Sequence, residues 1–164
     1  MGVRPQPRED RLEEIKVLCG ASLVKIIDKP HLDPVIIISK SRSHEIIKVL
    51  KEKFRYLHLS TLTACDNTPA KPRFHLSYHL YNFEKRIRIM LKVEVEEGES
   101  VHSIVDIWAG ANWLEREAYD MFGIVFAGHP NLRRLYLPEE FKGHPLRKEF
   151  PYSYRQEFSK GKSS

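Results

Sequence analysis

The most regular feature of the sequence is a strict alternation of hydrophobic and other residues between positions 74 and 95. Phe74, Leu76, Tyr78 and Leu80 occupy every second position, and after a turn at 82–85 the pattern resumes at the odd positions 87–95. A period of two places alternate side chains on opposite faces of a β-strand. We therefore predict a hairpin with one buried and one polar face.

Shorter patterns predict elements upstream of this hairpin. Residues 8–19 carry apolar side chains on one helical face, and Ser43 is expected to cap a second helix. Apolar runs at 22–28, 35–38 and 54–65 predict strands. Helices beside such strands give an α+β fold, with an antiparallel or mixed sheet of about four to five strands.

The last third of the chain, from Trp108 to Pro151, carries more charged residues, aromatics, glycines and prolines than a plain core requires. It begins with a predicted helix over 113–122. Asn112 and Glu115 have the spacing of a capping box, and Gly123 is a natural C-terminal stop. One domain is expected over residues 1–158, with an extended C-terminal segment and a flexible polar tail at 159–164.

Charged residues fill the remaining faces of this helix, and Arg116 and Asp120 have the i, i+4 spacing of an ion pair. A solvated surface helix is one interpretation. The flanking aromatics and the arginine fork, which suits part-buried carboxylates, favour an ion-pair network instead. The network is expected to join carboxylates to arginines: Glu115, Glu117 or Asp120 to Arg116, Arg133, Arg134 or Arg147.

Two similar turns follow the helix, Gly128-His129-Pro130 and Gly143-His144-Pro145. Each turn precedes leucine and basic residues, which predicts extended segments clamped onto another surface. The two histidines are expected to stabilise their turns rather than to catalyse. Glu115 and Glu117 are two positions apart on a helix, so they point in different directions and do not form an acid/base pair.

The stretch from Glu115 to Leu135 (EREAYDMFGIVFAGHPNLRRL) resembles the signature of the C subunit of respiratory complex I, the proton-pumping NADH–quinone oxidoreductase or NDH-1. The later stretch GHPLRKEFP, from Gly143 to Pro151, is similar to the second hallmark of that family, with Glu149 where aspartate is common. Chain length, block order and the upstream strands also agree. The resemblance therefore spans nearly the whole chain.

This resemblance implies a non-catalytic subunit of a translocase, with no flavin, nicotinamide or metal site of its own. FMN and iron–sulfur clusters would lie in other subunits. The chain would dock on the D subunit of complex I, which forms the quinone site with the B subunit, as a peripheral membrane protein on the cytoplasmic side of the inner membrane. Residues implied at the partner interface are Trp113, Glu115, Arg116, Glu117, Tyr119, Asp120, Phe122, Gly123, His129, Pro130, Arg133, Arg134, His144, Pro145, Leu146, Arg147 and Lys148.

Composition excludes several other classes. The 164 residues are 41% hydrophobic and 30% charged, as in an ordinary globular domain. No apolar run approaches the roughly 18 residues of a membrane-spanning helix. Cys19 and Cys65 stand alone, which suits a reducing compartment and excludes a self-contained zinc or iron–sulfur site. Phosphate-binding loops, dinucleotide fingerprints and nucleophile elbows are absent from the sequence.

Other functions remain open. Equivalent subunits occur in the photosynthetic ferredoxin–plastoquinone complex (its J subunit), F420H2 dehydrogenases and energy-converting hydrogenases, and the sequence does not report the electron donor. The net charge of +5 also permits an RNA-binding α+β module. Basic residues of the hairpin that would contact phosphates are Arg73, His75, Arg86, Arg88 and Lys92. A stand-alone hydrolase using Glu115, Glu117 and His129 is the weakest alternative.

Overall fold

The computed structural model describes residues 8–151 and 153, with side chains from Leu12 onward. The tail expected at 159–164 lies outside this part. The described helices are α1 (Arg8–Cys19), α2 (Ser43–Glu52) and α3 (Ala111–Phe122). Seven strands accompany them: β1 (Leu23–Ile27), β2 (Val35–Ser39), β3 (His58–Asp66), β4 (Phe74–Asn82), β5 (Ile87–Val95), β6 (Ser100–His102) and β7 (Val125–Ala127).

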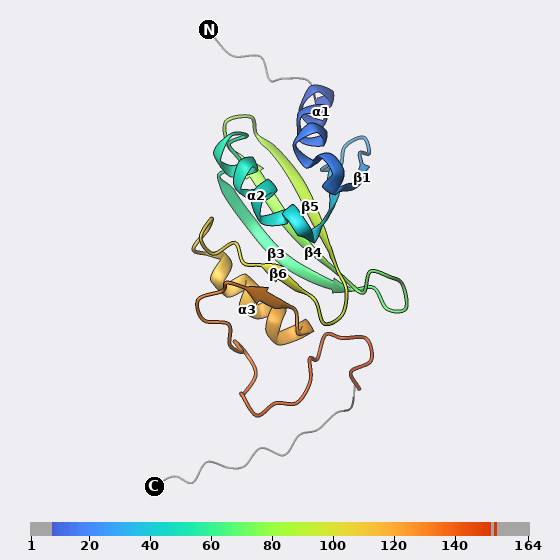
Figure 1. Cartoon of the computed structure of the whole chain (residues 1–164), viewed down its shortest axis with the longest axis vertical. Coiled ribbons are helices and arrows are strands. Elements are labelled where there is room, and N and C mark those ends of the chain that lie inside the picture. Colours follow the sequence, from blue (N-terminus) through green and yellow to red (C-terminus); the bar gives the residue numbers. More distant parts are fainter. Residues whose placement is uncertain (1–7, 152, 154–164) are drawn as a thin grey trace.

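Five of these strands form one mixed sheet in the order β1-β2-β5-β4-β3 (Figure 1). The predicted hairpin is its centre, with Phe74 opposite Val95 and Asn82 opposite Ile87. Strand β2 pairs with β5 in parallel, and the other neighbouring strands of the sheet are antiparallel. The α+β class and the expected number of strands are therefore confirmed.

The core lies between this sheet and the helices. Alternate residues of the hairpin point inward as the period of two predicted, and Leu76, Tyr78 and Leu91 have no exposed surface. In Figure 1, α1 and α2 lie across one face of the sheet, and α2 contributes its buried Ile46 and Ile47 to the core. Helix α3 lies against β3 at the edge of the sheet, which keeps that edge from standing free.

Local details differ from the prediction at three places. Ser43 is not a side-chain cap of α2, because its hydroxyl donates to the carbonyl of Lys40. Strand β3 begins at His58 rather than residue 54, because Arg55 has a left-handed φ of 60° that interrupts an extended chain. Strands β6 and β7 form a small parallel pair, and neither strand was predicted.

The chain beyond β7 has no helix or strand through residue 151. We call residues 128–151 the C-terminal arm. Its extended form was predicted from the two Gly-His-Pro turns. In Figure 1 the arm starts next to α3 and then passes beneath the sheet, so the whole signature block gathers at one end of the molecule.

Candidate docking surface

Helix α3 is the centre of this end of the molecule, and its sides face three different environments. Ala111, Ala118 and Phe122 are buried in the core. Arg116 and Asp120 are also buried, although by the arm rather than by the sheet. Trp113 and Glu117, four residues apart, remain exposed. The helix therefore uses Arg116 and Asp120 for internal contacts and presents Trp113 and Glu117 to the outside.

Arg116 fastens the start of the arm through backbone oxygens. Its guanidinium donates to the carbonyls of Arg133 and Arg134 at 3.1 and 2.9 Å. It also lies over the ring of Trp113, 5.0 Å from the ring centroid. The predicted Arg116–Asp120 pair is wrong, because the carbonyl groups of the arm occupy the arginine. Trp113 is consequently held in place on an otherwise exposed surface.

Asp120 fastens the next three residues. It has no exposed surface, and one carboxylate oxygen accepts the N–H groups of Leu135, Tyr136 and Leu137 at 2.9 to 3.0 Å. The other oxygen pairs with Arg134 at 2.7 Å. Burial acts to raise the pKa of Asp120, but these donors outweigh burial and hold the pKa below its ordinary value. This is the one predicted carboxylate–arginine pair of the helix that forms.

Gly123 is where the two signature stretches meet. Its φ of 76° ends α3 in the left-handed conformation, as predicted for a C-terminal glycine. A β-carbon at this position would lie 2.5 Å from the ring of His144 and 2.7 Å from the guanidinium of Arg147. Arg147 also donates to the carbonyl of Phe122 at 2.7 Å. Glycine is required here both for the turn and for the close approach of the arm.

A second cluster, which the sequence did not predict, holds the end of the arm against the sheet. Asp66, at the end of β3, accepts the N–H of Lys148 at 3.0 Å. Arg73 pairs with Glu97 at 2.5 Å and with Glu149. These partners are 24 to 82 positions apart in sequence. Of this cluster, only the turn at Asp66 could have been predicted from the sequence. An aspartate can accept the N–H of the residue two positions later in an Asx-type turn, and Asp66 does accept the N–H of Thr68.

Glu115 has a role different from the predicted cap and ion pair. The helix N-cap is Gly110, without a side-chain hydrogen bond. Glu115 is fully buried and accepts from the Ser103 hydroxyl and the Ile104 N–H, both at 2.7 Å. Burial raises the pKa of Glu115 to about 7, although both donors act in the opposite direction. Glu115 thus connects α3 to the segment after β6, and it points away from exposed Glu117, as predicted.

The rings of the two histidines contact backbone groups, and only that of His129 does so within its own turn. The ring of His129 accepts the N–H of Asn131 at 3.0 Å, two residues later in the same turn. The ring of His144 contacts the carbonyl of Asp120 at 3.0 Å. Burial lowers the pKa of His144, and the nearby Arg147 and Arg134 act in the same direction. The ring of His129 also contacts the carbonyl of Asn112 at 3.3 Å, so both rings connect the turns to α3.

The predicted interface residues thus separate by exposure. Four are buried and the rest are part-buried or exposed. The buried residues are Glu115, Arg116, Asp120 and Phe122. The part-buried ones are Tyr119, Gly123, His129, Arg134, His144, Pro145 and Arg147. The exposed ones are Trp113, Glu117, Pro130, Arg133, Leu146 and Lys148. Only the last group is free to make a large contact with another protein.

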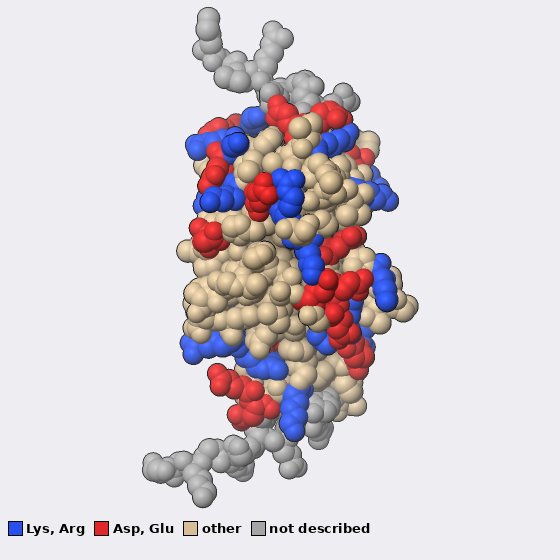
Figure 2. Space-filling model, in the orientation of Figure 1, with Lys and Arg blue, Asp and Glu red and all other residues tan. Residues whose placement is uncertain are grey.

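A hollow lies beside this exposed group, between α3 and β3. We call it the α3 groove. It has a volume of about 100 Å³ and is lined by β3 residues 62–64, by Glu117, Ala118 and Met121 of α3, and by Leu146 of the arm. Figure 2 shows one face of the molecule, on which charged side chains gather over α1 and α2 and a broad uncharged area lies where β6 and α3 run.

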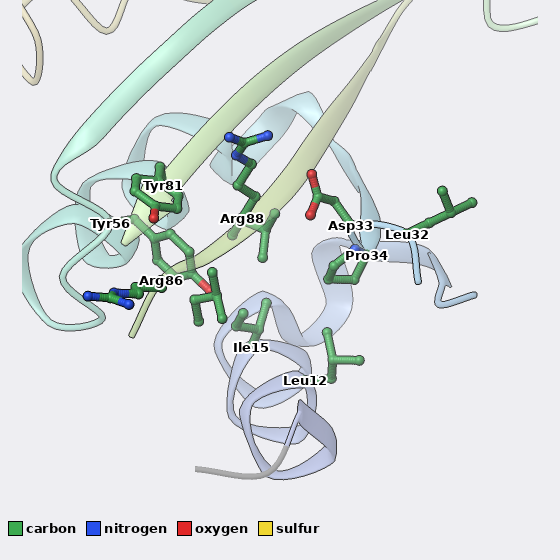
Figure 3. Close-up of a pocket in the computed structure, with 11 residues that line it drawn as sticks. Leu12, Ile15, Leu32, Asp33, Pro34, Tyr56, Tyr81, Arg86 and Arg88 are labelled. Atoms are coloured by element: carbon green, nitrogen blue, oxygen red, sulfur yellow. The ribbon is translucent and has the colours of Figure 1, made fainter. Parts of the chain in front are cut away.

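Another hollow, of about 410 Å³, lies at the opposite end of the molecule, next to α1 (Figure 3). Asp33 and Arg88 are among its lining residues and lie above Leu12 and Ile15 in this view. None of the described signature residues lines it. Within residues 8–151, no three His, Cys, Asp or Glu side chains are grouped as metal ligands. No helix in that range is long and apolar enough to cross a membrane.

Comparison with known proteins places these features in a family. Residues 36–156 match the family model described as "Respiratory-chain NADH dehydrogenase, 30 Kd subunit". The C subunit of NADH-quinone oxidoreductase from Geotalea uraniireducens is 42% identical over 117 residues, 71% of each chain. The C/D subunit from Bdellovibrio bacteriovorus is 36% identical over 150 residues, 90% of this chain and 27% of that one. A chain of the membrane-bound sulfane sulfur reductase, an archaeal respiratory membrane complex, has the same fold, with a TM-score of 0.71, 20% identity and coverage of 95% and 97%.

Proposed function

Because the chain belongs to the family of the respiratory-chain NADH dehydrogenase 30 Kd subunit, which is the C subunit of NADH-quinone oxidoreductase, we propose that it is a structural subunit which docks on the D subunit. In this role it supports assembly and rigidity of the quinone-binding module of the peripheral arm, on the cytoplasmic side of the membrane. Electrons pass from NADH to quinone through neighbouring subunits, including the B subunit, and drive proton translocation there. FMN and iron–sulfur clusters belong to those subunits.

The observation that carries this proposal is that the signature block contains two kinds of residue, one with internal contacts and one exposed. The internal contacts hold the C-terminal arm against α3 and are made by Arg116, Asp120 and Arg134. Trp113 and Leu146 are left 57% and 54% exposed. Aromatic and aliphatic side chains fixed on a rigid support are what a docking surface needs, whereas catalysis needs convergent polar groups in a cleft.

The fused relatives support the D subunit as the partner. In Bdellovibrio bacteriovorus and in Aquifex aeolicus, a protein named as a C/D subunit contains a region similar to this chain. Joining two subunits in one polypeptide is tolerated when the two parts assemble side by side. The same relationship is expected here between separate chains.

The test is a tagged pull-down from native membranes solubilised in mild detergent, followed by mass spectrometry and an optical spectrum. The proposal expects a protein of the D-subunit type together with iron–sulfur absorbance. The remaining subunits would then name the donor: NADH, ferredoxin, coenzyme F420 or hydrogen. Recovery of the chain alone, or with RNA, would overturn the proposal. Against an RNA surface, Arg73 of the expected phosphate-binding set already pairs with Glu97 and Glu149.

A further inference from the structure

The α3 groove has features that specify the chemistry of its occupant. We propose that it receives one apolar side chain of the D subunit, next to a lysine or arginine of the same segment that pairs with Glu117. This inference rests on the proposed function, and it adds the site and the kind of residue that fills it.

The expectation of an apolar side chain comes from the residues that line the groove. Leu62 and Ala118 are buried and form the inner wall. Met121 is part-buried and Leu146 is 54% exposed at the rim. A hollow of about 100 Å³ with such walls suits a single aliphatic or aromatic side chain rather than a small-molecule ligand, whose pockets are usually about 300 Å³ or larger.

The expectation of a basic residue in the partner comes from Glu117. It is the one charged residue lining the groove, and no described residue pairs with it. By contrast, both buried carboxylates of α3 have their donors: Asp120 has Arg134, and Glu115 has Ser103 and Ile104. If a partner covered the groove without a counter-charge, Glu117 would lose water without compensation. Charge complementarity therefore requires a basic residue next to the apolar one.

Two fixed positions beside the groove support docking rather than chance exposure. Trp113 does not line the groove but lies one turn from Glu117, and it contacts the guanidinium of Arg116, which is itself anchored on two backbone carbonyls of the arm. The backbone of Leu146 is fixed by a hydrogen bond from its N–H to the carbonyl of Met121 at 3.1 Å. Groups whose positions are already fixed lose less conformational entropy on binding, which favours their use as anchors.

The experiment compares variants in the native complex. Leu146→Glu and Glu117→Lys are introduced into the tagged chain, and the co-purified D subunit is quantified by mass spectrometry. We expect Leu146→Glu to lower the recovered D subunit at least about tenfold, because it would place a charge in an apolar contact. We expect Glu117→Lys to lower it at least about threefold, with a greater effect at low salt.

Matched controls lie on other surfaces. Val24→Glu changes a residue of β1 with 53% exposure, and Glu52→Lys reverses an exposed charge of α2. Both are expected to recover the D subunit as the unmodified chain does. Circular dichroism of each isolated variant verifies its fold. If the unmodified chain recovers no D subunit, the proposed function fails. If it does and the groove variants match the controls, only the present inference is overturned.

A second measurement identifies the occupant directly. The photo-reactive amino acid p-benzoylphenylalanine replaces Leu146, and the assembled complex is irradiated and digested. The expected cross-link joins position 146 to a peptide of the D subunit in which a lysine or arginine lies next to an apolar residue. A cross-link to a peptide without a basic residue, to another subunit, or to a second copy of this chain contradicts the proposal, as does the absence of any cross-link.

Discussion

Removing the Asp120 carboxylate is expected to release the arm from α3. In Asp120→Ala, the N–H groups of residues 135–137 and the guanidinium of Arg134 lose their shared acceptor. Breaking a buried, hydrogen-bonded charge pair by removing one partner costs about 3 to 5 kcal/mol. Because Asp120 has no exposed surface, water cannot replace the lost contacts without opening the structure. We therefore expect a loss of about 3 to 5 kcal/mol in the free energy of unfolding.

A graded series separates the contributions of the two oxygens. Asp120→Asn keeps one oxygen for the three N–H groups and loses the charge that faces Arg134, so its cost is expected to be smaller, about 1.5 to 3 kcal/mol. In the double variant Asp120→Asn/Arg134→Met, the loss of unfolding free energy is expected to differ from the sum of the two single losses by about 1 to 2 kcal/mol, since both changes remove the same contact. Glu84→Gln, in an exposed pair with Arg55, is the control and should change little.

Urea denaturation of the isolated chain measures these differences. Hydrogen exchange measures the opening of residues 135–137, in case the arm detaches while the sheet stays folded. We expect either a lower unfolding free energy or faster exchange of these three amides in Asp120→Ala. If the alanine variant retains unfolding free energy within about 1 kcal/mol and unchanged amide exchange, Asp120 does not hold the arm.

Three further changes test other contacts. The pKa of Glu115, about 7 in the fold against an ordinary 4.5, contributes stability that is complete below pH 4.5 and is lost as pH rises through 7. The Glu115 contribution to the unfolding free energy should therefore fall by roughly 2 to 3 kcal/mol between pH 5 and pH 8, and the unmodified chain should lose that much more stability over this range than Glu115→Gln in urea titrations. Gly123→Ala should lower the melting temperature through its positive φ and the contact with His144, whereas Gly110→Ala, with open space around it, should not. Arg73→Met should speed proteolysis of the arm's end and leave the rate of tryptic cleavage elsewhere unchanged, and unchanged digestion of the arm's end would contradict its role as a clamp.

The sequence predicted what depends on local periodicity. The hairpin from Phe74 to Val95 and the stop at Gly123 follow from alternation and from backbone freedom, and both are observed. The partners of the charged residues were harder to predict. Arg116 has Asp120 at the favourable i, i+4 spacing, yet it binds two backbone carbonyls. Every residue carries a carbonyl, so a sequence gives no sign of which carbonyl an arginine will reach.

Long-range clusters were not predictable for a related reason. Asp66 and Lys148 are 82 positions apart, and the residues around each of them do not indicate that the two come into contact. Glu115 has the spacing of a capping residue, but the approach of the segment at Ser103 buries it instead. For Glu115 the prediction identified a charged residue that mattered and failed on its partner, whereas Asp66 was not identified at all. In both cases the partner is fixed by the tertiary fold.

The arm has no helix or strand through residue 151, so its shape depends on a few side chains that each hold several backbone groups. Asp120 accepts hydrogen bonds from three consecutive N–H groups, and Arg134 donates to the carbonyls of Phe141 and Gly143. Tolerance to substitution along the arm should consequently be sharply uneven. Exposed positions such as Glu139 can vary freely, whereas a change at Asp120 or Arg134 alters the course of many residues at once.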